Sequence, residues 1–244
     1  MRMLLIAAMF AAQIAASPAL DVSSLTVAAP AFVCELDMNQ LKGELRRVSW
    51  SPDGRSIHVQ TAGADATPRD YIVSVMDGVV SLAFGEPEWA AQYWAMKSNL
   101  AAPGVPSLRL EVQLNNRRTR PTPFTGGTAN GGAYTPDVKN PVDAFESEVT
   151  LRLQGLELGS WINDAPMAGD TFGWGPPASA AIVYVARGDR LTLMDQEKRR
   201  SVVATVKGAA FPAWSTDGSR IAFVQRTGKK KYRLMIAAVG RATL

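Results

Sequence analysis

Two segments of this chain carry the same pattern: an aromatic residue, a small hydroxyl residue, an Asp-Gly pair and then an apolar run. The first segment extends from Trp50 to Val59, and the second extends from Trp214 to Phe223. An Asp-Gly pair before a strand-like run indicates a hairpin, because glycine adopts the positive φ that a tight turn requires. A hairpin that recurs in this way restricts the chain to folds assembled from copies of one β unit.

The spacing of the aromatic residues suggests what that unit is. Weaker copies of the pattern place further anchors between the two clear ones, so that the five anchors are Trp50, Trp89, Tyr134, Trp174 and Trp214, spaced 39, 45, 40 and 40 residues apart. A period of about 40 residues with several short strands is typical of a propeller blade.

A second strand-like run follows each anchor. These runs are Tyr71–Val75, Leu108–Val112, Val149–Leu153, Leu191–Met194 and Tyr232–Ile236. Several of them alternate apolar and polar residues, which is the period of a β-strand, and no helical stripe stands out after residue 19. We therefore expect an all-β propeller of four-stranded antiparallel sheets with five blades, or six blades if the first is truncated.

Two further runs precede the first anchor, Phe32–Leu36 and Glu44–Val48. We expect both to complete the last blade and so to close the ring. Closure would remove exposed sheet edges, which otherwise invite aggregation.

The segment Trp50-Ser51-Pro52-Asp53-Gly54 resembles the WD40-like (PD40) repeat of TolB-type β-propellers. It is also similar to repeats in the N-terminal propellers of prolyl-oligopeptidase-type peptidases. The resemblance covers residues 45–240 and implies the propeller fold. TolB proteins carry an additional N-terminal α/β domain for which this chain has no room, so we expect one propeller domain over residues 20–244.

The first 19 residues have the features of a secretory signal peptide: Arg2, an apolar run from Met3 to Ala12, and small residues at Ser17 and Ala19. The apolar run is about half of the roughly 20 residues that a transmembrane helix needs. We expect cleavage after Ala19, a periplasmic or secreted protein, and no transmembrane span.

Charge is distributed unevenly along the chain. Residues 20–177 hold 12 Lys+Arg and 18 Asp+Glu, a balance of −6, whereas residues 178–244 hold 13 and 4, a balance of +9. Two basic clusters are candidate binding residues. Arg117, Arg118 and Arg120 begin a Gly- and Pro-rich stretch over residues 115–132 that we expect to be a long loop. The other cluster is Lys229, Lys230, Lys231 and Arg233, at a predicted hairpin turn. A solvated loop and a solvated turn are the alternatives.

The sequence predicts no catalytic, cofactor or metal site. His58 is the only histidine and Cys34 the only cysteine. A Ser-His-Asp triad could therefore use only His58, and the sequence disfavours a histidine-based zinc site. We interpret His58 as a buried histidine between blades, and Cys34 as a buried thiol. Paired carboxylates remain an alternative, because some five-bladed propellers are glycoside hydrolases. The candidates are Glu86, Glu88, Asp137, Asp143, Glu146 and Glu148.

These observations favour an exported, non-enzymatic propeller that binds another envelope protein or an anionic ligand. Nucleic acid is a poor fit for an exported chain with few interleaved aromatic residues. A glycoside hydrolase and a sensor or regulatory propeller of an envelope complex are the alternative functions. Fold alone does not decide among them.

Overall fold

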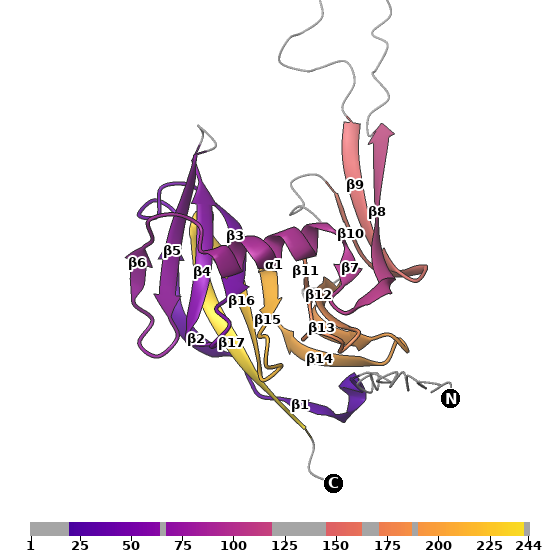
Figure 1. The fold of residues 1–244 in the computed structure, drawn as a ribbon. Coiled ribbons are helices and arrows are strands. Elements are labelled where there is room, and N and C mark those ends of the chain that lie inside the picture. The colour runs from indigo at the N-terminus through magenta and orange to yellow at the C-terminus, as the bar shows by residue number, and fades with distance from the viewer. Residues whose placement is uncertain (1–19, 64–66, 119–144, 163–170, 187–189, 242–244) are drawn as a thin grey trace, which may run out of the picture.

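The structure is a computed structural model of the 244-residue chain, and it describes residues 20–63, 67–118, 145–162, 171–186 and 190–241. In these residues most of the secondary structure is strand, and the strands form four antiparallel sheets, with one α-helix between two of them (Figure 1). The all-β propeller predicted from the repeat is confirmed.

Two of the sheets are regular four-stranded meanders. The first sheet contains β3 (Glu44–Trp50), β4 (Ser56–Ala62), β5 (Pro68–Ser74) and β6 (Val80–Leu82). The third sheet contains β11 (Phe172–Trp174), β12 (Ala181–Ala186), β13 (Arg190–Asp195) and β14 (Arg200–Thr205). In both sheets every strand pairs with its neighbour in the chain.

The second sheet has much longer central strands. It contains β7 (Ala101–Ala102), β8 (Val105–Arg118), β9 (Phe145–Leu153) and β10 (Leu156–Ile162). The β8–β9 pair projects well beyond the other sheets (Figure 1). Residues Asn115–Arg118, which we expected to begin a loop, are the last residues of β8.

The fourth sheet joins the two ends of the chain. It contains β15 (Ala209–Trp214), β16 (Arg220–Gly228) and β17 (Lys231–Arg241). The N-terminal strands β1 (Leu25–Val27) and β2 (Ala31–Asp37) both pair with β17, and a short 3₁₀ helix, Val22–Ser24, precedes β1. The prediction that Phe32–Leu36 completes the last blade is confirmed. The same prediction for Glu44–Val48 is wrong, because this run is part of β3 in the first sheet.

The sheets follow one another around a ring. β3 contacts β15, β15 contacts β11, and β10 contacts β12, so the first sheet neighbours the fourth, the fourth the third, and the third the second. Helix α1 (Glu88–Ser98) contacts both β3 and β7 and links the first sheet to the second (Figure 1).

The described residues thus form four sheets where the repeat spacing predicts five blades. Trp89, expected to open the second blade, lies on α1, so that prediction is wrong, as is the expectation of no helix. Tyr134, expected to open the third blade, lies outside the described residues, as does Asp137. Trp174 and Trp214 do occur on the first strands of their sheets.

The Asp-Gly turns have the predicted conformation. Gly54 and Gly218 have φ of 66° and 77°. In each turn the aspartate accepts the hydroxyl of the preceding serine at 2.6 Å, from Ser51 to Asp53 and from Ser215 to Asp217. Local side-chain hydrogen bonds of this kind favour a turn over continued strand.

The first turn of each sheet lies at one end of the ring, which we call the turn end. The turn of the fourth sheet lies against that of the third, because a Cβ on Gly218 would come within 2.9 Å of Pro176 Cγ. The third and second sheets are joined there by the amide of Ala178, which donates to Pro103 O at 2.9 Å.

Three junctions between sheets are apolar. One cluster includes Leu36, Val59 and Phe211 between the first and fourth sheets. Further clusters lie between the fourth and third sheets, and between the third and second. The face of the first sheet toward α1 is different, because it presents buried polar residues such as Ser49, His58 and Asp70.

Candidate functional site

The basic hairpin predicted from the sequence is present. Lys229 and Lys230 form the turn between β16 and β17, and Lys231 is the first residue of β17. All three side chains are exposed, and none of the described carboxylates forms an ion pair with them. The three ammonium groups face solvent, and the carboxylate in register with the hairpin, Asp37 opposite Lys231, forms no ion pair with it.

Hydrogen bonds connect this hairpin to a second loop. The amide of Met38 donates to Lys230 O at 2.9 Å, which fixes the β2–β3 loop beside the hairpin. Exposed Lys42 lies on this loop, and its carbonyl accepts a hydrogen bond from Arg69 Nη1 at 2.7 Å. The positive surface thus continues from the fourth sheet onto the first.

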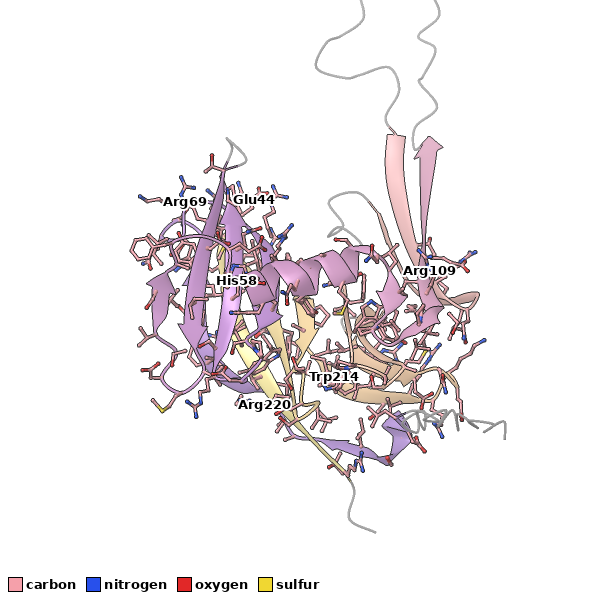
Figure 2. All side chains as sticks on the ribbon, viewed as in Figure 1. Glu44, His58, Arg69, Arg109, Trp214 and Arg220 are labelled. Atoms are coloured by element: carbon pink, nitrogen blue, oxygen red, sulfur yellow. The ribbon has the colours of Figure 1, made fainter. Side chains whose placement is uncertain are left out.

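The surface also extends in the other direction. The amide of Arg226 donates to Gly208 O at 2.8 Å, next to exposed Lys207 on the β14–β15 loop. We call the combined surface the basic rim, and its members are Lys42, Arg69, Lys207, Arg226, Lys229, Lys230 and Lys231. Figure 2 shows Glu44 and Arg69 at the end of the ring opposite Arg220, so the basic rim and the turn end are on opposite sides.

The described carboxylates nearest the rim already have partners. Glu35 lies 3.9 Å from Arg233 across β2 and β17, in an exposed pair. Asp37 accepts the amide of Asn39 at 2.9 Å, and Glu44 lies 3.4 Å from Arg46. Exposed pairs of this kind contribute little to stability, about 0–1 kcal/mol. Arg233 is thus paired, whereas the three hairpin lysines are not.

The arginines of the second predicted cluster lie elsewhere. Arg117 and Arg118 end β8, in register with Glu146 and Phe145. Arg120 lies outside the described residues. Arg117 and Arg118 belong to the second sheet, whereas the hairpin lysines belong to the fourth, so the two predicted clusters come from different sheets.

Sequence reasoning missed Lys42, Arg69, Lys207 and Arg226. Lys42, Arg69 and Lys207 are isolated in the sequence, and loop contacts bring them next to the hairpin. Arg226 is three residues before Lys229 on β16, so its proximity in the sequence was a usable signal. Only the pairing of β2 with β17 would have indicated that Lys42 lies near Lys230.

His58 is buried, as predicted, and lies beneath helix α1 (Figure 2). Its Nε2 is 2.8 Å from Asp70 Oδ1, which also accepts Gln60 Nε2 at 2.9 Å. The ring of Trp89 meets the imidazole edge-on at 6.0 Å. Burial lowers the pKa of His58, and this effect outweighs the opposing attraction of Asp70. With no exposed surface, His58 is placed to hold the helix against the sheet rather than to meet a substrate.

The structure describes four of the six candidate catalytic carboxylates. Glu86 Oε1 lies 2.6 Å from Arg47 Nη1, and Glu88 accepts Gln92 Nε2 at 3.0 Å. Asp137 and Asp143 lie outside the described residues. Glu146 and Glu148 are on β9, in register with Arg117 and Asn115 of β8. Among the described residues, no group of three or more His, Cys, Asp and Glu is placed to hold a metal ion.

Cys34 is buried on β2, opposite Leu234 of β17. Burial raises the pKa of its thiol to about 11. The interpretation of Cys34 as a buried thiol is confirmed. None of the helices in the described ranges has the length and hydrophobicity needed to cross a membrane.

Two solved structures align with the chain at low sequence identity. TolB from Acinetobacter baumannii aligns with 79% of this chain at 10% identity and a TM-score of 0.27, and the chain spans 42% of that protein's length. A putative TolB from Agrobacterium tumefaciens aligns with 91% of this chain at 13% identity and a TM-score of 0.26, over 71% of its own length. No protein-family model and no curated protein matches the sequence.

Proposed function

We propose that this chain is an exported binding module of the bacterial envelope, whose basic rim docks on an acidic face of a partner protein. The observation that carries the proposal is the cluster of Lys229, Lys230 and Lys231, which is exposed and lacks ion-pair partners among the described residues. Lys42, Lys207 and Arg226 extend it over the loops on both sides.

A rigid ring supports this function physically. The hairpin lysines join two strands that are buried in an apolar junction within a few residues of the turn, at Val224 in β16 and Leu234 in β17. The backbone positions that carry these charges are therefore fixed relative to one another. Charges of one sign gathered on one surface raise association rates and select a complementary partner, in a salt-dependent way.

The proposal is tested by replacing Lys229, Lys230 and Lys231 together with serine. Binding to immobilised poly-L-glutamate is measured by surface plasmon resonance at low and at moderate salt. We expect the variant to bind severalfold more weakly at low salt and to differ less at higher salt, because salt screens exposed charges over about 10 Å at 0.1 M. The melting temperature should stay nearly unchanged.

A matched variant replaces Lys198, Arg200 and Arg241 with serine. These exposed residues are outside the basic rim, and their removal changes the net charge by the same amount. If both triple variants lose the same affinity, the effect is one of total charge and the basic rim is not a specific surface. Envelope proteins cross-linked at a cysteine introduced at Lys229, but not at Lys198, would identify the partner.

Export rests on the signal peptide predicted for residues 1–19. Cleavage after Ala19 would make Leu20 the first residue of the mature protein. The amide of Leu20 donates to Ser179 O at 3.1 Å, and Val22 is fully buried, so the domain is anchored from its predicted first residues. N-terminal sequencing of the protein from the envelope fraction should begin at Leu20. Recovery of a chain that retains Met1 would contradict export by cleavage.

A further inference from the structure

A cavity of about 650 Å³ opens at the turn end, where the first and fourth sheets meet. The first sheet contributes the Asp-Gly turn with Arg55, and Val75 and Met76 after β5. The fourth sheet contributes Arg220, the first residue of β16. Figure 2 shows Arg220 at the end of the molecule opposite Glu44, so this cavity is separate from the basic rim.

The cavity has two guanidinium groups in its wall. Neither Arg55 nor Arg220 forms an ion pair with any carboxylate in the part of the chain that the structure describes. The nearby carboxylate of Asp53 accepts the hydroxyl of Ser51 at 2.6 Å and the amide of Arg55 at 3.0 Å. Asp53 attracts Arg55, and Asp217 of the neighbouring turn attracts Arg220. Because the cavity is lined by two guanidinium groups and only one carboxylate, that of Asp53, a net positive charge remains for a ligand.

Arg220 is held in a defined position. Its Cζ lies 4.8 Å from the centroid of the Trp50 ring, which favours a stacked guanidinium. Gly54 leaves the space for it, because a Cβ at Gly54 would overlap Arg220 Nη2. A guanidinium held in this way is ordered before a ligand arrives, and this reduces the entropy lost on binding.

The two residues that follow β5 contribute apolar surface, beside the hydroxyl groups of Ser56 and Ser74. Met76 is 92% exposed, and Val75 precedes it. An exposed methionine adapts to apolar ligands of varied shape. The cavity therefore offers two cationic donors on one side and a flexible apolar surface on the other.

We propose that this cavity binds a small organic carboxylate, with the carboxylate between Arg55 and Arg220 and the apolar chain against Met76. The planar guanidinium matches a carboxylate through paired hydrogen bonds. The proposal is independent of the partner bound at the basic rim.

The test titrates sodium hexanoate into the ¹⁵N-labelled protein and follows the Gly54 amide and the Trp50 indole N–H by NMR. We expect saturable shifts of both signals. Hexan-1-ol, which has the chain but no charge, should leave them in place. Inorganic phosphate, which has charge but no chain, should bind more weakly than hexanoate. Equal binding of phosphate and hexanoate would overturn the assignment of an organic ligand.

Variants locate the site. Arg55→Gln should weaken hexanoate binding about tenfold, the loss of one charge-assisted contact. Arg220→Lys keeps the positive charge but loses the planar guanidinium, and this variant should bind hexanoate severalfold more weakly than the parent does. Arg46→Gln, an exposed arginine at the opposite end of the ring, is the matched control and should bind as the parent does. Parental affinity in a folded Arg55→Gln protein would overturn the proposal.

Discussion

The indole N–H of Trp50 donates a hydrogen bond to the carbonyl oxygen of Ala213 at 2.9 Å, across 163 positions of sequence. Trp50 ends β3 in the first sheet, and Ala213 is on β15 in the fourth. Trp214, the corresponding residue of the other clear repeat, donates instead to Gly218 O at 3.0 Å within its own turn. Two tryptophans with the same place in the repeat therefore have different roles, and only Trp50 bonds across the junction of the first and fourth sheets.

This difference predicts unequal effects of the same substitution. Trp50→Phe should lower the free energy of unfolding by about 1–3 kcal/mol, because it leaves the buried carbonyl of Ala213 without its donor. Trp214→Phe removes a similar volume but leaves Gly218 O in a turn that water can reach. This substitution should therefore lower the free energy of unfolding by less than Trp50→Phe does. Urea unfolding of both variants checks this. Equal costs would show that lost volume, and not the bond between the sheets, determines the effect.

The turn of the fourth sheet gives a second prediction. Gly218→Val should destabilise the protein by about 1–3 kcal/mol, because a β-branched residue is strained at positive φ. Its Cβ would also come within 2.9 Å of Pro176 Cγ. Gly228→Val is the control, since its Cβ would meet only Lys231 Cβ at 3.7 Å. A Gly218→Val protein as stable as Gly228→Val would rule out strain in this turn.

His58 predicts a pH dependence of stability. Burial lowers its pKa below the ordinary value of 6.5, so the unfolded chain binds a proton more readily than the folded one. Its contribution is therefore complete above about pH 6.5, decreases as the pH falls through that value, and stops decreasing below the folded-state pKa.

The measurement compares melting temperatures of the parent and His58→Gln between pH 7.5 and 5. Gln keeps an N–H for Asp70 but does not titrate in this range, so the variant should show a smaller decrease. Because the chain has one histidine, no other imidazole contributes to the difference between the two curves. Parallel curves would contradict the lowered pKa.

The burial of Cys34 predicts a thiol of low reactivity. With its pKa raised to about 11 and its side chain buried between β2 and the first sheet, the reactive thiolate is scarce at pH 8. Ellman's reagent should react very slowly with the native protein and should report one thiol per chain in denaturant. Rapid labelling of the native protein would show that β2 detaches from β17.

The sequence indicated those parts of the fold that depend on local chemistry. The Asp-Gly turns at Gly54 and Gly218 are set by a few neighbouring atoms, and the alternation in runs such as Tyr232–Ile236 reflects burial on one face of a strand. Such patterns hold in almost any surroundings, so these turns and strands were predictable.

Helix α1 was not predictable in the same way. Its buried residues Ala90, Trp94 and Lys97 follow helical spacing, and Trp89 and Tyr93 widen the same face, but this face includes a lysine. The Lys97 ammonium lies 4.3 Å from the Trp94 ring and 5.0 Å from that of Phe172 in the third sheet. Burial of a lysine is tolerated here because these aromatic rings lie beside its ammonium group. The sequence alone does not show that they are neighbours. The same holds for Lys42 and Lys207, which become part of the basic rim only through contacts between loops.

The pairing of β2 with β17 has a consequence for the order of folding. Cys34 and Leu234 are Cα partners 200 positions apart, so β2 is synthesised long before the strand that covers its edge. Until β17 arrives, β2 and β16 both present unpaired backbone groups, which are templates for pairing with other chains. Closing so long a loop is slow compared with forming a hairpin. The fourth sheet can therefore assemble only after synthesis of β17, and a chain interrupted before Lys231 should accumulate in aggregates even though most of its strands are present.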